Sequence, residues 1–241
     1  MVERRLAELA ERAGQRDAAV FSRFLDPAEQ LLARNAARRA QIGLRLEGGQ
    51  PQSERKMAAF FPEDGRDLEW PFVCIQVTWD ARYGTVRHPD LLGASLALAQ
   101  DRSCFGDIWV EEGKAYLFVV RELSEHIAQS MTEAGRVRLQ NTVLAQWPDP
   151  PEQRVRTRRD TVASLRLDAL AASAFDLSRS QAQDLIREGR VKVNHMPTLQ
   201  TDAQLVVGDL LSLRGHGRAQ LTEVGGKNRK GRTAIVWSCC E

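Results

Sequence analysis

The fold is decided by the stretch DLSRSQAQDLIREGRVKVN, residues 176–194. Ser178 and Gln181 have the spacing of a capping box, which predicts a helix that begins directly after Ser178. We expect this helix to end at Gly189, because glycine readily adopts the left-handed conformation that closes a helix. The residues beyond Gly189 alternate strictly, so the two valines are predicted to face a core and their polar neighbours to face outward. The stretch therefore predicts a helix that leads directly into a strand.

The neighbouring sequence extends this unit in both directions. Before it, Arg166-Leu167-Asp168 opens a shorter helix with an apolar stripe along one face. After it, residues 195–197 and 208–209 have the composition of turns, and a further strand is predicted from Leu210 to Arg214.

Cationic side chains recur along these elements. Arg179 lies in the first turn of the predicted helix, where free backbone amides and the helix dipole favour a phosphate. A cationic face with polar groups between the charges suits the phosphates and 2′-hydroxyls of folded RNA better than the base edges of DNA. We favour RNA binding over a merely solvated helix face, because the cations recur on several elements. The predicted RNA-binding residues are Arg166, Ser178, Arg179, Ser180, Gln183, Arg187, Arg190, Lys192, Asn194, Arg214 and Arg218.

The distribution of charge supports this surface. The 241-residue chain carries a formal net charge of only +2. From Pro151 onward, however, fifteen Lys and Arg stand against ten Asp and Glu, whereas the rest of the chain has nineteen against twenty-two. Such a segregation of positive charge indicates a polyanionic partner.

The C-terminal unit resembles the RNA-binding domain named after small-subunit ribosomal protein S-four. The matching residues are Arg166-Leu167-Asp168, Leu177-Ser178-Arg179-Ser180-Gln181-Ala182, Ile186, Gly189-Arg190-Val191, Val193-Asn194, Gly208-Asp209 and Arg214-Gly215. The resemblance implies two helices packed on a small β-sheet, with an RNA site on the second helix and the following strand. It places an S-four-type domain, with a tail, in residues 161–241.

Residues 1–50 are predicted to form an N-terminal helical segment. Two helices are predicted from apolar residues at helical spacing, Leu6, Leu9, Ala10 and Ala13 in the first and Val20, Phe21 and Phe24 in the second. A third helix begins after Asp26, with Pro27 at its first position and Glu29 placed to close a capping box.

Residues 54–147 alternate between strand and helix patterns. The predicted order is strand 72–79, helix 88–98, strand 106–110, strand 115–120, helix 122–134 and strand 137–144. This is the order of a ferredoxin-like sheet, which RNA-recognition motifs also use. Tyr116 and Phe118 share one strand face and either stack on RNA bases or belong to the core. We favour the core, because alternating aromatics are ordinary strand material.

A basic linker is predicted between the middle domain and the last one. Residues 148–160 contain three prolines followed by a basic run, namely Pro148, Pro150, Pro151, Arg154, Arg156, Arg158 and Arg159. The fold class is therefore α+β, with a helical N-terminal segment, a ferredoxin-like (RRM-like) middle domain and an S-four-type C-terminal domain.

Two further stretches resemble the YlmH family of RNA-binding proteins, so that the resemblance covers nearly the full length. They are Arg23-Phe24-Leu25-Asp26-Pro27-Ala28-Glu29-Gln30 and Asp101-Arg102-Ser103-Cys104-Phe105-Gly106-Asp107-Ile108. The resemblance implies a bacterial or plastid, ribosome-associated protein that binds structured RNA (rRNA, tRNA). It also implies a role on stalled large ribosomal subunits that carry peptidyl-tRNA, within ribosome-associated quality control.

We expect no catalytic residues, no metal and no cofactor. Zinc-protease, phosphate-loop and serine-elbow motifs are absent, and Asp107 is better explained as a turn-forming residue than as a catalytic carboxylate. Two alternatives stay open. The chain is either an RNA-modifying enzyme, similar to a pseudouridine synthase, with an unrecognised site in the middle domain, or a scaffold that acts through its N-terminal helices.

The expected location is the cytoplasm. No secretory signal is recognisable, the longest apolar stretch (Leu91 to Ala99) is too short to span a bilayer, and no membrane or DNA partner is expected. The four cysteines (Cys74, Cys104, Cys239, Cys240) show neither metal-ligand spacing nor a disulfide pattern, which favours free thiols. A redox role for Cys239 and Cys240 stays open.

Overall fold

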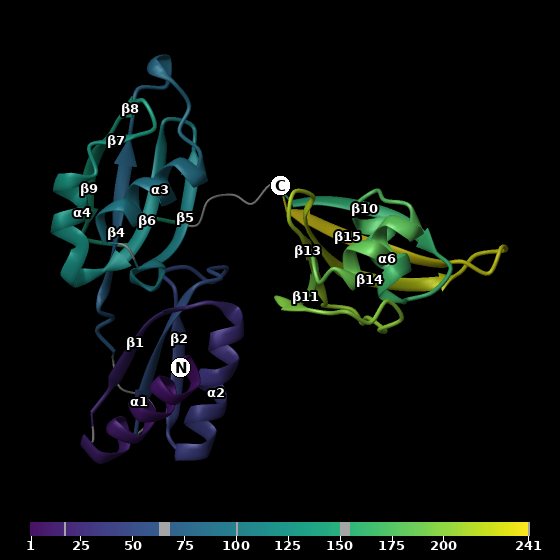
Figure 1. The fold of residues 1–241 in the computed structure, drawn as a ribbon, viewed down its shortest axis with the longest axis horizontal. Coiled ribbons are helices and arrows are strands. Elements are labelled where there is room, and N and C mark those ends of the chain that lie inside the picture. Colours follow the sequence, from purple (N-terminus) through teal and green to yellow (C-terminus); the bar gives the residue numbers. More distant parts are fainter. Residues whose placement is uncertain (17, 63–67, 100, 150–154, 241) are drawn as a thin grey trace. The chain divides into compact units, whose positions relative to one another are not determined.

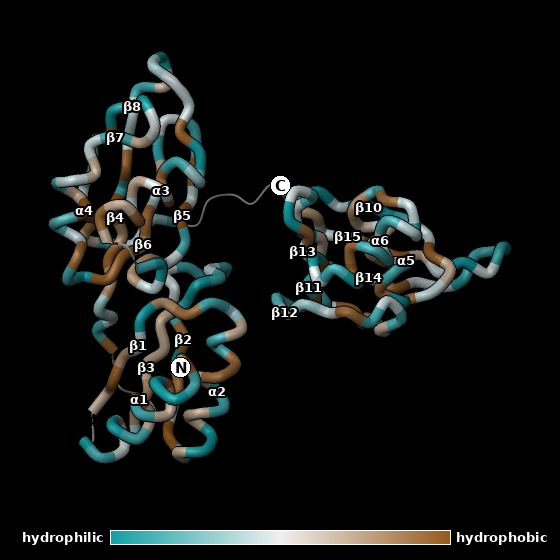
Figure 2. The backbone as a smooth tube through the Cα atoms, in the orientation of Figure 1, coloured by the Kyte–Doolittle hydropathy of each residue, from teal (hydrophilic) through white to brown (hydrophobic). Residues whose placement is uncertain are grey.

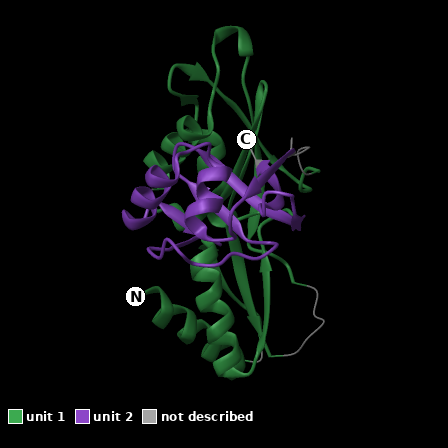
Figure 3. Cartoon of the chain, turned by 90° about the vertical axis from the view of Figure 1, so that its right-hand side faces the viewer, with its two compact units in different colours: residues 1–151 green, residues 152–241 purple. Residues whose placement is uncertain are grey.

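The computed structural model describes residues 1–16, 18–62, 68–99, 101–149 and 155–240 (Figure 1). These residues form two compact units, 1–151 and 152–241 (Figure 3). Apolar residues line the inner strands and the packed helix faces of both units (Figure 2), and each unit has its own hydrophobic core.

The first part of unit 1 is a small α/β layer. Its elements are α1 (Val2–Arg16), β1 (Val20–Leu25), α2 (Pro27–Ala40), β2 (Gly43–Glu47) and β3 (Lys56–Phe61). The strands form an antiparallel sheet in the order β1-β3-β2. Alanines of both helices pack with Phe60 of the central strand in a separate core cluster. The predicted capping box of α2 is confirmed, because the Asp26 side chain accepts from the Glu29 amide and Glu29 accepts from the Asp26 amide.

The prediction of a wholly helical N-terminal segment is wrong. The apolar residues expected on a second helix lie instead on strand β1, where Val20 pairs with Phe60 and Phe24 with Met57. A short run of β-branched and aromatic residues fits a strand and a helix equally well by spacing, and the partner strand decides between them. That partner, β3, lies more than thirty residues further along the chain.

The middle domain has the predicted ferredoxin-like order. Its main elements are β4 (Phe72–Thr78), α3 (His88–Ala99), β5 (Phe105–Glu111), β6 (Lys114–Val120), α4 (Ser124–Ser130) and β9 (Gln140–Leu144). All strand neighbours in the sheet β5-β6-β4-β9 are antiparallel. The second helix is shorter than predicted, because the chain turns back through a small hairpin of β7 (Glu133–Ala134) and β8 (Val137–Arg138).

Tyr116 and Phe118 both belong to the core. Phe118 is fully buried and Tyr116 is 8% exposed. Phe118 packs against the rings of Phe72, Trp109 and Trp147. The alternative in which these two rings stack on RNA bases is therefore excluded for this sheet.

Unit 2 is a six-stranded antiparallel sheet in the order β10-β15-β14-β13-β11-β12, with two helices packed on it (Figure 1). Its elements are β10 (Val155–Val162), α5 (Leu167–Ala174), α6 (Arg179–Arg187), β11 (Val191–Val193), β12 (Met196–Pro197), β13 (Leu210–Leu213), β14 (Gly217–Lys227) and β15 (Thr233–Cys240). Trp237 is fully buried in the core of this unit, and its indole Nε1 donates to Ser173 Oγ at 3.0 Å.

The basic linker predicted over residues 148–160 is wrong for residues 155–160. They form most of edge strand β10, which pairs with β15 from Val155↔Cys240 to Val162↔Thr233. The charged run was interpreted as a linker because its partner strand lies about eighty residues further along the chain. Exposed edge strands, however, often carry charged side chains. Pro150, Pro151 and Arg154 lie outside the described residues.

Asp107 connects the two parts of unit 1. Its carboxylate accepts from the backbone amides of Glu54 (2.6 Å) and Arg55 (3.1 Å), which lie just before β3. The Arg55 guanidinium donates in turn to the carbonyls of Phe105 and Phe24. Burial raises the pKa of Asp107, while the Arg55 amide and the nearby guanidinium groups oppose that rise. The structure therefore uses this carboxylate to hold the small α/β layer on the middle sheet.

We expect Asp107→Ala to destabilise unit 1 by about 1–3 kcal/mol, because two amides of the junction lose their acceptor. Urea unfolding followed by tryptophan fluorescence reports mainly on this unit, since four of the five tryptophans lie in it. Glu112→Ala, in an exposed turn, is the control and should leave the midpoint unchanged. Equal midpoints for both variants would show that Asp107 does not hold the junction.

Candidate nucleic-acid interface

Helix α6 begins where its capping residues dictate. Ser178 Oγ accepts from the Gln181 amide at 3.2 Å, and Gln181 Oε1 accepts from the Ser178 amide at 2.9 Å. This confirms the predicted capping box and puts Arg179 at the first position of the helix. At the other end Gly189 has φ +70°, as predicted, and the Arg190 amide donates to the Leu185 carbonyl.

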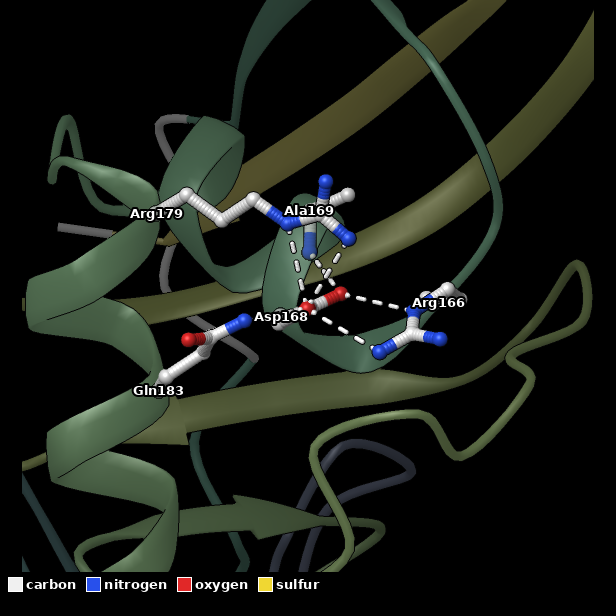
Figure 4. A network of polar contacts seen from close by, with 5 residues as sticks. All are labelled: Arg166, Asp168, Ala169, Arg179 and Gln183. Carbon is white, nitrogen blue, oxygen red and sulfur yellow. Dashed lines mark hydrogen bonds and ion pairs between the residues drawn. The ribbon is translucent and has the colours of Figure 1, made fainter.

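A buried carboxylate gathers three of the predicted site residues (Figure 4). Asp168 is fully buried in the first turn of α5. Its Oδ1 accepts from Arg166 Nε at 3.2 Å, and its Oδ2 accepts from Arg179 Nε at 3.1 Å and Gln183 Nε2 at 2.8 Å. The Ala169 amide completes the set at 2.9 Å. One carboxylate thus joins the start of α5 to the first turns of α6.

The carboxylate is held in its charged form. Burial by itself disfavours the charge, but hydrogen bonds from Arg166, Gln183 and Arg179, together with the Arg179 charge, outweigh it. The net result lowers the pKa of Asp168 to about 2. The same contact raises the pKa of Arg166. All three charges are therefore present at neutral pH.

This arrangement presents two oriented cations to solvent. The side chains of Arg166 and Arg179 are 35% and 53% exposed although both bind Asp168. A guanidinium fixed through one edge still has N–H donors on its other edges. Two arginines and one aspartate leave a net positive charge at the capped end of α6, which suits a phosphate group.

A second group of predicted residues lies on the strands. Lys192 pairs with Ser212, and Ser212 pairs with Arg218, so the three side chains share one row on one face of the sheet. Their neighbours Val191, Leu211 and Leu213 are buried on the other face, which belongs to the core. Lys192 and Arg218 are exposed and point away from that core.

The remaining predicted residues have more local surroundings. Arg187 pairs with Asp184 at 3.2 Å and Arg190 with Glu188 at 3.6 Å, and both arginines stay more than half exposed. Ser180 and Arg214 are exposed. The Asn194 side chain donates to Asp209 and accepts from the Leu210 amide, so it fixes the strand ends.

Two features escaped the sequence analysis. Asp168 was expected only to open a helix, although its position two residues after Arg166 is a usable signal for a local ion pair. The other is the tip of the β14–β15 ribbon, which is coloured teal and white, without hydrophobic residues (Figure 2). Its exposed residues read GGKNRKGR (225–232) and contain four cations and no acid. A glycine-rich basic run between two alternating strands could have identified it.

The ribbon tip has a defined shape. Asn228 Oδ1 accepts from the amides of Lys230 and Arg232 at 2.9 and 3.0 Å. The Arg232 guanidinium donates to Thr161 at the end of β10. Lys227, Arg229 and Lys230 have no acidic partner among the described residues. The ribbon therefore offers three further cations on a preformed turn.

Other kinds of site find no support within the described ranges. No group of three or more His, Cys, Asp or Glu side chains there could hold a metal ion. Cys74, Cys104 and Cys239 are free thiols. None of the described helices is long and apolar enough to cross a membrane.

Comparisons with known proteins find one family match within each unit. A family model described as "Putative RNA-binding domain in YlmH" matches residues 66–145, and one described as "S4 domain", the S-four type expected, matches residues 165–209. Ribosome-associated protein quality control protein P2 of Bacillus subtilis (strain 168) is 35% identical over 218 residues, which cover 89% of this chain and 84% of that protein.

A solved structure shows a similar fold. Cell division protein ylmH from Streptococcus pneumoniae aligns with a TM-score of 0.52 at 15% sequence identity. The alignment covers 59% of this chain and 88% of that one. At this identity the likeness concerns the fold alone.

Asp168→Asn should destabilise unit 2 by about 2 kcal/mol, because the charged anchor of two arginines is lost. The direction in which the stability of unit 2 changes with pH follows from the lowered pKa of Asp168. The stabilisation is complete above about pH 4, the ordinary range of an aspartate, and is lost as pH falls towards 2. The variant should lack this acid-dependent part. Hydrogen exchange of peptides covering residues 167–187, measured between pH 2 and 6, reports both effects.

The matched control is Asp184→Asn, which removes the charge of an exposed partner of Arg187 on the same helix. It should change stability by no more than about 0.5 kcal/mol. If these peptides exchange at the same rate in Asp168→Asn and in the wild-type chain at every pH, the carboxylate is not the anchor of α5 and α6.

Proposed function

This chain belongs to the YlmH family, and we propose that it is a ribosome-associated RNA-binding protein that acts without catalysis on structured rRNA or tRNA. We place its work in the cytoplasm, in the quality control of stalled large ribosomal subunits. The observation that carries the proposal is the pair of arginines, Arg166 and Arg179, that Asp168 orients at the capped end of α6.

Structured RNA is the polyanion that best fits the C-terminal unit. The oriented guanidinium groups of Arg166 and Arg179 suit phosphate oxygens, and exposed Ser180 and Lys192 add a hydroxyl and a further cation. Arg214, Arg218 and the ribbon tip widen the positive area beyond a single helix. An extended array of cations matches the repeated phosphates of a folded RNA better than a single small anion.

The ribosomal role is supported by kinship. The Bacillus subtilis relative is named as a ribosome-associated quality control protein, and the match to it runs through most of both chains. This chain itself carries both domain matches, with the S4 domain after the YlmH RNA-binding domain. We therefore propose that the large subunit and its tRNA are the partners of this surface.

A role without catalysis fits the one carboxylate singled out in the middle domain, since Asp107 is occupied by the amides of Glu54 and Arg55. The competing proposal is an RNA-modifying enzyme. Mass spectrometry of rRNA and tRNA from a deletion strain separates the two, and we expect an unaltered modification map. A modification that disappears with the gene and returns with it would establish the enzyme.

Binding to structured RNA should weaken steeply with salt, since phosphate contacts release counterions. In fluorescence anisotropy, Lys192→Glu and Arg179→Gln should each weaken binding roughly tenfold. Each should also reduce the slope of log K against log salt concentration by about one, the value expected for one lost phosphate contact. Glutamine is chosen at position 179 because a glutamate would stand beside the Asp168 carboxylate. Lys192→Arg keeps the charge and should bind as the wild-type chain does. Wild-type affinity and slope in both charge variants would refute the assigned surface.

The ribbon tip is tested in the same assay. Removing its three unpartnered charges, with Lys227→Gln, Arg229→Gln and Lys230→Gln together, should lower the salt slope by up to about three contacts. The matched control replaces each lysine by arginine and the arginine by lysine (K227R, R229K, K230R), which keeps all three charges and should keep the wild-type slope. If the neutral triple variant keeps the wild-type slope, the ribbon does not contact RNA.

A further inference from the structure

One end of the middle domain carries a cleft between two turns. Its lining comes from the segment around the short 3-10 helix Ala81–Tyr83, which follows β4, and from the β7–β8 hairpin with the residues after it. The cleft is lined by Trp79, Tyr83, Arg136, Arg138 and Gln140, among others. The two segments meet at Gly84, where a side chain would lie 2.8 Å from Val137 Cγ2.

Tyr83 is by far the most exposed aromatic side chain in the described part of the chain. It is 78% exposed, whereas the next most exposed, Trp147, is 38% exposed. Its backbone is fixed, because the Tyr83 amide donates to the Asp80 carbonyl and the Asp80 side chain caps the turn through the Arg82 amide, each at 3.0 Å. A large ring held in water on a rigid turn offers a flat surface for stacking at little cost in entropy.

Three arginines lie in or beside this cleft. The Arg82 guanidinium lies 5.9 Å from the Tyr83 ring centroid and is paired with Asp80, the one carboxylate among the described residues that line the cleft. Arg136 and Arg138 are exposed and have no acidic partner among the described residues. Glu133 stands opposite Arg138 in the hairpin register but makes no ion pair with it. Three arginines against Asp80 leave the cleft positive.

We propose that this cleft binds an unpaired RNA base, which stacks on Tyr83 while Arg136 and Arg138 hold the adjoining phosphates. An exposed aromatic ring beside guanidinium groups is how proteins take up single-stranded RNA. All of these residues lie within the segment 66–145 that matches the YlmH RNA-binding domain. The site deepens the proposed function and rests on it, and it assigns the middle domain a preference for unpaired RNA. It takes the role that the buried rings of Tyr116 and Phe118 cannot fill.

The test uses the full chain and two probes, a short oligouridylate and an RNA duplex of the same length. Tyr83→Ala should weaken binding to the oligouridylate roughly tenfold, since one stacked base is lost. Tyr83→Phe keeps the ring and should bind as the wild-type chain does. Arg136→Gln with Arg138→Gln should weaken binding and lower the salt slope by about two contacts. Binding of the duplex should be unchanged in Tyr83→Ala, because its bases are already paired.

Two results would overturn the proposal. Tyr83→Ala that binds the oligouridylate like the wild-type chain would show that no base stacks there, and equal weakening in Tyr83→Phe would show that the ring face is not what matters. Either result leaves the proposed function intact if the wild-type chain still binds structured RNA through Lys192. Absence of all RNA binding by the wild-type chain would remove both.

Discussion

The buried carboxylate of Asp168 is the constraint on which the C-terminal unit depends. It receives hydrogen bonds from Arg166 on one side and from Arg179 and Gln183 on the other, so it sets how α5 and α6 pack. A charge in this position is stable only because its partners outweigh the loss of water. The same contacts orient the two guanidinium groups before any ligand arrives. In the proposed function, stability and RNA recognition therefore depend on the same set of contacts.

The rest of the proposed interface is built around that group. The apolar face of the sheet packs beneath α5 and α6, which leaves its other face for Lys192 and Arg218. Further out, the β14–β15 ribbon carries cations on a turn that Asn228 closes. In the middle domain, buried and exposed aromatic rings differ clearly in what they can contact. The strand aromatics Tyr116 and Phe118 are buried in the core, whereas Tyr83 on a surface turn is exposed and is the ring that we propose stacks on a base. Each unit would then recognise a different feature of RNA, phosphates in one and an unpaired base in the other.

Much of this fold was predictable from local chemistry. The caps at Asp26 and Ser178, the stop at Gly189 and the strand order of the middle domain all follow from residue type and spacing. What failed depended on partners distant in sequence. Strand β1 looked helical and β10 looked like a linker, because β3 and β15, which pair with them, cannot be recognised as partners from either run alone. The candidate cations were predictable as a group, but the anion that orders them was not, since the burial of Asp168 is a tertiary property.

The central claim is that Asp168 prepares Arg166 and Arg179 for RNA, and the RNA affinity of Asp168→Asn tests it most directly. Removal of a negative charge from a positive surface should, by charge alone, strengthen binding to a polyanion. If orientation of the arginines matters more, the variant binds structured RNA more weakly than the wild-type chain, measured by anisotropy at neutral pH on protein shown to be folded. We predict the weaker binding. Equal or tighter binding would contradict the account.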